Sequence, residues 1–187
     1  MDNKTPQPHE PTQPDPPGAE DPPAPALSPQ DFRTYNRMAE HMDLFHAHFR
    51  HTWTTLYGAC TANERPAGTS LRAFLRLAAD FAARLALHHA IEERHIFPVL
   101  AARMPAFRQE LQLLTQHKRI HAGLERFEAY VVECQEGGRE LRLVELGRLM
   151  DGFGEVLWRH LDEEVQMLGA ENMRRFWSLE EMRGMPM

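Results

Sequence analysis

Residues 71–93 read LRAFLRLAADFAARLALHHAIEE, and this stretch decides the fold. Its apolar side chains recur every three or four residues from Leu71 to Leu85, which is the spacing of one face of an α-helix. The next positions at this spacing are His88 and Glu92. Side chains four residues apart lie one above the other on a helix. The pair therefore continues the buried face with two groups that can bind a metal.

Two further pairs have the same spacing and also continue an apolar stripe: His117 with His121, and His160 with Glu164. One such pair alone would also fit an exposed contact between neighbouring turns. Three pairs on three helices favour a buried site, where an unpaired carboxylate costs several kcal/mol. A pair of divalent cations would stabilise the whole set, because neutral imidazoles are nitrogen ligands and a carboxylate has two oxygens that can bridge two metals.

The helical period continues along the body of the chain. Ser28 is expected to cap a helix that ends near Cys60, and Thr69 or Ser70 to cap a second that falters near Pro98. A third helix is expected from near Pro105 to the glycines at 137–138, and a fourth from about residue 139, with Met167 the last residue of its apolar stripe. Long helices with short connections predict an all-α fold, an up-down-up-down antiparallel four-helix bundle. We expect a disordered tail over 1–27, the bundle over 28–170, and an extension over 171–187 whose short helix packs on the bundle.

The first helix offers several histidines, at positions 41, 46, 48 and 51. His46 fits the apolar stripe best, and His41 is the second choice. His89 and Glu93 lie one position round the second helix, at the edge of its buried face. We expect them to support the ligands or to pack between helices. Glu163 is an alternative to Glu164, since both can lie near one face of the fourth helix.

Composition excludes several classes of function. Net charge is −6 and basic residues are scattered, which argues against nucleic acid as a partner. There is no apolar run of about 18 residues to span a membrane and no apolar signal core, so a cytoplasmic protein is expected. Ten of the 14 prolines lie between positions 6 and 29. This composition predicts a disordered tether, or a docking segment for a protein that recognises proline-rich sequence.

The ordered motifs resemble the hemerythrin-like (HHE cation-binding) domain family over about residues 32–168. The segments that carry the resemblance are a histidine in the first helix, HHAIEE at 88–93 before Phe97-Pro98, HKRIH at 117–121 and HLDEE at 160–164. The segment WSLEEM at 177–182 is similar to fungal-type members. The resemblance implies a non-haem centre of two iron ions (Fe2+/Fe3+), oxo- or hydroxo-bridged, held by five histidines and two bridging carboxylates. Carried over, these ligands are His46, His88, Glu92, His117, His121, His160 and Glu164.

One departure from the family bears on function. Oxygen-carrying members have an Asp five residues after the last histidine, where this chain has Val165 and places Glu164 one position earlier. The resemblance therefore implies a protein that binds O2 or another small ligand, or senses iron or oxygen, more than a reversible oxygen carrier. The alternative is an enzyme, a di-iron oxygenase, oxidase or peroxide-reducing protein that acts on a small molecule. A structural bundle that binds zinc adventitiously ranks last.

Overall fold

The computed structural model describes residues 25–108 and 112–186, so most of the expected tail at 1–27 lies outside the described residues. The regular secondary structure of the described part is helical throughout, and the prediction of an all-α helical bundle is confirmed. None of the helices in these ranges combines the length and the hydrophobicity that crossing a membrane requires.

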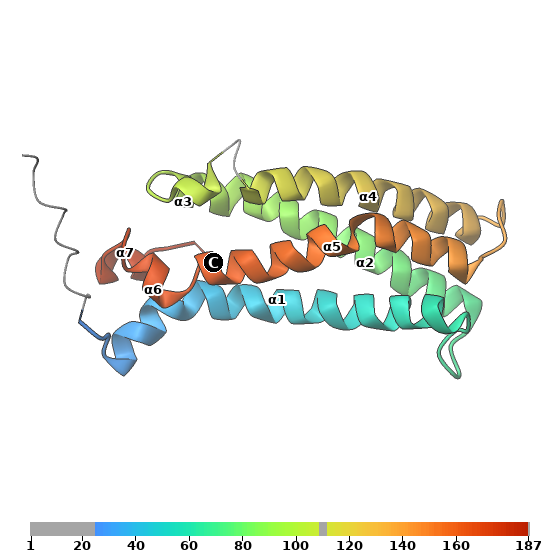
Figure 1. Ribbon diagram of the computed structural model, residues 1–187, viewed down its shortest axis with the longest axis horizontal. Coiled ribbons are helices and arrows are strands. Elements are labelled where there is room, and N and C mark those ends of the chain that lie inside the picture. Colours follow the sequence, from blue (N-terminus) through green and yellow to red (C-terminus); the bar gives the residue numbers. More distant parts are fainter. Residues whose placement is uncertain (1–24, 109–111, 187) are drawn as a thin grey trace, which may run out of the picture.

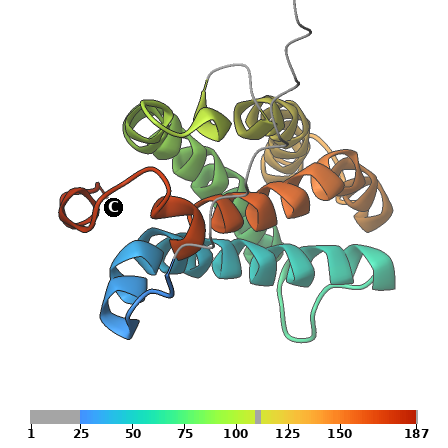
Figure 2. The same cartoon turned by 60° about the vertical axis from the view of Figure 1, so that its left-hand side comes forward.

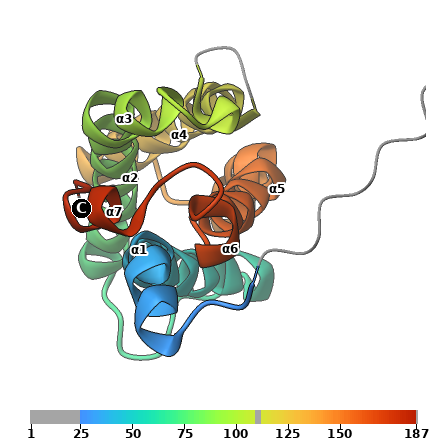
Figure 3. The ribbon, with the colours of Figure 1, turned by 90° about the vertical axis from the view of Figure 1, so that its left-hand side faces the viewer.

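Four long helices form the body of the molecule: α1 (Pro29–Ala62), α2 (Leu71–Ile91), α4 (Gln112–Gln135) and α5 (Leu143–Met167). Figure 1 shows that successive long helices run in opposite directions. Helix α4 packs against α2 and α5, and α1 packs against α2 and α5, so the four helices surround one interior. The end view in Figure 3 shows this arrangement.

The first two helices begin at the serines that the sequence indicates. The side chain of Ser28 accepts a hydrogen bond from the backbone N–H of Asp31, and Pro29 occupies the first turn. The side chain of Ser70 accepts one from the N–H of Ala73. These caps satisfy backbone donors that have no partner inside the helix. Helix α1 ends two residues later than expected, at a left-handed Asn63.

The chain stays helical beyond the end of α2 at Ile91, but the pitch of the helix changes. Residues Glu92–Ile96 form a π-helical turn, η1, followed by the short helix α3 (Phe97–Ala101). The backbone N–H of Phe97 bonds the carbonyl of Glu92, five residues back. Pro98 has no N–H to donate, so the series of α-helical backbone hydrogen bonds is interrupted at this residue. Such π turns are often found at functional sites.

The third and fourth helices begin later than predicted. Residues Pro105–Phe107 form a 3-10 turn, η2, and Arg108 is extended, so the α-helix does not start near Pro105. Helix α5 starts at Leu143 instead of about residue 139. There the hydroxyl of Tyr130 accepts a hydrogen bond from the N–H of Arg142 and donates to its carbonyl, which holds the loop outside the helix.

The C-terminal segment forms two short helices, α6 (Ala170–Met173) and α7 (Leu179–Arg183). Ser178 and Glu181 form a reciprocal capping box at the start of α7. Both short helices pack against α1, at the end of the bundle where α1 begins (Figure 2). Buried Met173 and Met182 contribute to this contact, and Phe176 and Trp177 are partly buried there.

The buried apolar side chains form two clusters with a polar layer between them. One cluster runs on α1 from Phe49 to Cys60, and the other includes Tyr35 to Met42 on the same helix. His46 lies between the two clusters and is completely buried. A similar order holds along α5 and the residue after it, where His160 and Glu164 lie between Leu157 of the first cluster and Leu168 of the second. The bundle thus encloses its buried imidazoles and carboxylates between the two clusters.

Candidate metal centre

Two groups of side chains in this polar layer have the composition of metal sites. The first contains His89, Glu92, His117 and His160, and the second contains His46, His88, Glu92 and Glu164. Within each group every residue offers one ligand atom, and these atoms lie within 4.8 Å of one another. Glu92 belongs to both groups. The arrangement therefore fits two neighbouring cations that share a carboxylate.

Hydrogen bonds fix the orientation of three of the imidazoles. Nδ1 of His46 lies 3.0 Å from the carbonyl oxygen of Leu161, and Nδ1 of His117 lies 2.8 Å from Oε1 of Glu93. A carbonyl oxygen or a carboxylate oxygen accepts, so each Nδ1 is the N–H that donates. The Nε2 atoms are then left as lone pairs that point into the layer, an orientation typical of metal-bound histidine.

The proton on His160 can be placed in the same way, because its Nδ1 contacts the side-chain amide of Gln116. Nε2 of Gln116 donates to Oε2 of Glu163 over 2.6 Å, and this contact fixes which way the amide faces. Oε1 of Gln116 then lies 3.3 Å from Nδ1 of His160 and accepts its proton. Nε2 of His160 is left as a lone pair, and it lies 3.2 Å from Nε2 of His117.

Two lone pairs therefore face each other at the His117–His160 contact, and no hydrogen bond can join them. Two nitrogens bound to one cation at about 2.1 Å and at right angles to each other lie about 3 Å apart. The observed 3.2 Å matches that separation. Nε2 of His46 and Nε2 of His88 lie at a similar distance, 3.3 Å. Each group thus contains an imidazole pair at the spacing of two ligands of one ion.

Both carboxylates lie between the two groups. Oε1 of Glu92 is 2.8 Å from Nε2 of His88, and its Oε2 is 3.5 Å from Nε2 of His117. Oε2 of Glu164 is 3.4 Å from Nε2 of His46 and 3.5 Å from Nε2 of His160. Each carboxylate thus contacts one imidazole of each pair, which is the position of a bridging ligand.

The pKa values of the residues in this layer are shifted in the directions that favour a bound cation. Burial, then the neighbouring His46 and His117, lowers the pKa of His88 to about 3. Burial also holds the pKa values of His89 and His160 well below their usual range. Burial and the nearby Glu164 raise the pKa of Glu92 well above its usual range. Neutral imidazoles of His88, His89 and His160 therefore lie around Glu92, a carboxyl group whose ionised form a bound cation would stabilise.

Unpartnered buried atoms give an independent test of whether metal fits. Within the described residues, both oxygens of Glu92, both oxygens of Glu164 and both ring nitrogens of His89 are buried and form no hydrogen bond. The 2.8 Å contact between Glu92 and His88 lacks hydrogen-bond geometry and is not an ion pair while the imidazole is neutral. Buried polar atoms without partners are rare. Metal coordination would satisfy the four carboxylate oxygens and one ring nitrogen of His89, because an imidazole binds a cation through a single nitrogen.

Six of the seven predicted ligands are brought together: His46, His88, Glu92, His117, His160 and Glu164. His121 differs from the prediction, because it is half-buried and belongs to neither group. His89 is completely buried instead of lying at the edge of α2, and its ring stacks on that of His117 with centroids 3.9 Å apart. His89 thus joins the first group, although the sequence had predicted for it only a supporting or packing role.

The structure also separates the alternatives on α1 and α5. His46 takes part in the second group, while His41 lies outside both groups and lines a neighbouring pocket. Glu164 faces the imidazoles, and Glu163 bonds Gln116 behind them. Glu93 supports His117 as expected for a partner of the ligands. Gln116 gives no signal in the sequence, because nothing in its spacing distinguishes it from a surface glutamine.

The fold and these residues define a class of protein, a helical bundle with a buried imidazole–carboxylate cluster that could hold metal ions. The family model of the hemerythrin HHE cation-binding domain matches residues 37–170, so the chain belongs to this family. The match includes all six clustered ligand candidates and His89. No curated protein and no solved structure shows significant similarity to the chain.

Proposed function

We propose that this protein holds two iron ions in the polar layer and binds O2 or another small ligand there, as a sensor of oxygen or iron. The supporting observation is the pair of facing lone pairs on His117 and His160, which a bound cation would turn into a favourable contact. A mixed set of imidazoles and carboxylates suits iron, among other divalent metals. Family membership supports a cation-binding role.

Some residues would bind the ions and others would orient the residues that bind them. His46 and His88 would hold one ion, and His89, His117 and His160 the other, with Glu92 and Glu164 between them. When bound, the two ions would supply open coordination positions for a small ligand. Glu93, Gln116 and the carbonyl of Leu161 would keep the imidazole protons on Nδ1.

Aromatic side chains would restrict water at the centre. The ring of Phe49 packs against His88 with centroids 5.1 Å apart, and the ring of Phe97 stacks on His117 at 5.2 Å. Both aromatic residues are buried. A dry surrounding strengthens electrostatic interactions between ligands and cations.

Metal analysis of the purified protein, together with its absorption spectrum before and after anaerobic reduction, tests the proposal. We expect about two irons per chain, and a coloured species that forms on exposure of the reduced protein to air and persists. One zinc and no iron per chain would refute it.

An enzymatic role is the second candidate, and one observation favours it. A pocket of about 340 Å³ between α1 and α2 is lined in part by His88 and Glu92, so a small organic molecule could reach the edge of the centre. Rapid loss of the oxidised spectrum with conversion of an added substrate would favour this role over stable ligand binding.

A further inference from the structure

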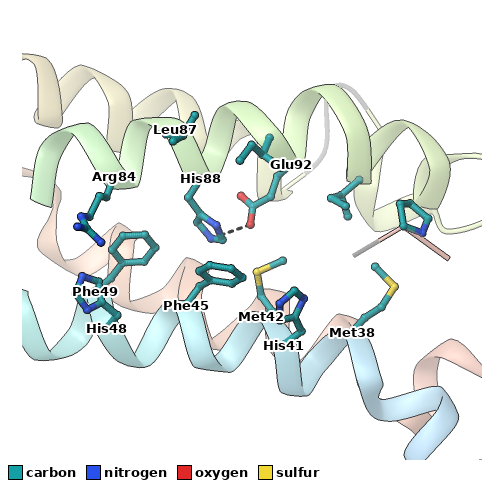
Figure 4. Close-up of a pocket in the computed structure, with 13 residues that line it drawn as sticks. Met38, His41, Met42, Phe45, His48, Phe49, Arg84, Leu87, His88 and Glu92 are labelled. Atoms are coloured by element: carbon teal, nitrogen blue, oxygen red, sulfur yellow. Dashed lines mark ion pairs between the residues drawn. The ribbon is translucent and has the colours of Figure 1, made fainter. Parts of the chain in front are cut away.

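The pocket beside the centre is apolar along most of its length. It lies between α1 and α2, and Figure 4 shows Met38, Met42, Phe45 and Phe49 along the α1 side, facing Arg84, Leu87, His88 and Glu92 on the other. The α1 residues from Met38 to Phe49 cover about 16 Å of helix, at about 1.5 Å per residue. A volume of about 340 Å³ lies within the range of small-molecule sites. The pocket is therefore long, narrow and suited to one slender ligand.

Three large apolar side chains that line this pocket are exposed to solvent. The exposed fractions are 48% for Phe45, 61% for Leu87 and 47% for Ile91. Scattered exposed apolar residues are ordinary, but a group around one hollow marks a binding surface. The thioethers of Met38 and Met42 add flexible apolar walls that adapt to a chain-like ligand.

The charge at one end of the pocket is positive. Arg84 lies towards the same end as His48 and Phe49 (Figure 4) and is the one Arg or Lys among the lining residues. Within residues 25–108 and 112–186, Arg84 forms no ion pair. The lining contains one acidic residue, Glu92, which faces the imidazoles of the centre. The pocket thus offers a free guanidinium for an anion and apolar walls for the rest of the ligand.

We propose that this pocket binds an unbranched aliphatic carboxylate, with its carboxylate at Arg84 and its chain along the methionines and Phe45. A guanidinium binds a carboxylate through two parallel hydrogen bonds, which gives the site its preference for this headgroup. The chain then passes the His88–Glu92 pair. Presentation of that chain to the metals rests on the proposed function, whereas binding itself does not.

Calorimetric titration of the full-length protein, as purified, with decanoate below its micellar concentration tests the proposal. Metal content is measured on the same sample. We expect one saturable site, and affinity that rises about fourfold for each methylene between octanoate and decanoate. Decanol and decylammonium should bind at least about tenfold more weakly, because they lack the anionic headgroup.

Variants at exposed positions distinguish the contribution of the headgroup contact to binding from that of the apolar walls. Arg84→Gln should weaken decanoate about tenfold, while Arg76→Gln, two turns earlier on α2 and also exposed, should not. Arg84→Glu should reverse the preference towards decylammonium. Ile91→Ser should weaken decanoate about fivefold, whereas Val132→Ser, exposed on α4, should leave it unchanged.

Several results would overturn the proposal: no saturable binding, equal affinity for the three headgroups, or the same affinity in Arg84→Gln and Arg76→Gln. Self-association of the chain that buries Leu87 and is unaffected by decanoate would also overturn it, and would assign the groove to a second copy. A sample that contains iron but does not bind decanoate would refute the ligand proposed for the pocket and leave the proposed metal centre intact. Decanoate binding in a sample without iron would support the pocket and contradict the metal centre.

Discussion

Replacement of His89 distinguishes the site in the structure from the site that spacing predicts. His89 is completely buried and belongs to the group with Glu92, His117 and His160, while the second group does not contain it. His89→Ala should therefore lose one of two cations and retain the other, so iron per chain should fall to about half. His121→Ala is the matched control, since His121 is half-buried and outside both groups. Its iron content should be unchanged.

Replacement of His89 should also change the free energy of unfolding, and the sign of this change should depend on whether metal is bound. Both ring nitrogens of His89 are buried without a hydrogen bond, and one unsatisfied buried polar group costs about 1–3 kcal/mol. In chelated protein, His89→Leu replaces the imidazole by an apolar side chain of similar size and should raise the free energy of unfolding by about 1–3 kcal/mol. With iron bound, the variant should be less stable than the wild type, because a ligand of the native state has been lost.

Metal analysis by mass spectrometry and urea unfolding, with and without a chelator, measure these two effects. Full iron content in His89→Ala together with loss of iron in His121→Ala would refute the reasoning and restore the ligand set inferred from spacing. A His89→Leu variant that is destabilised equally with and without metal would show that the imidazole has a packing role instead.

Three other outcomes are expected. Glu92→Gln should lower iron content further than any single histidine variant, because Glu92 belongs to both groups; retention of one tightly bound iron would contradict a bridging role. Gly123→Ala should lower the free energy of urea unfolding by about 1–3 kcal/mol, because its new Cβ would lie 2.7 Å from Cδ1 of Phe153, whereas Gly58→Ala, with no atom within 4 Å, should raise it by about 1 kcal/mol. Hydrogen bonds from the Ser178 backbone, and then from Arg103, lower the pKa of Glu181 from 4.5 to about 2, so the stabilisation of α7 should be complete above pH 4.5 and disappear as the pH falls towards 2. Tryptophan fluorescence should report this loss in the wild type, and Glu181→Gln should show no such transition.

The sequence by itself determined the helices and the level of the site. Ser28 and Ser70 mark helix starts because their side chains can satisfy free backbone N–H groups there. The helical period places His88, His117 and His160 on buried faces, because side chains on one face recur every three or four residues. Buried polar groups at one level of several helices indicate a shared site. These features depend on local spacing and on the cost of burial.

Only the tertiary structure decided which of two adjacent residues faces which neighbour. Helix α2 packs against both α1 and α4, so His88 faces His46 while His89 stacks on His117, and both positions are used. A period of 3.6 residues defines one broad face and cannot divide it between two partners. The π turn at Glu92, the late start of α5 and the support of His160 by Gln116 likewise depend on contacts between distant segments. The pocket at Arg84 arises in the same way, because it exists only where α1 and α2 lie side by side.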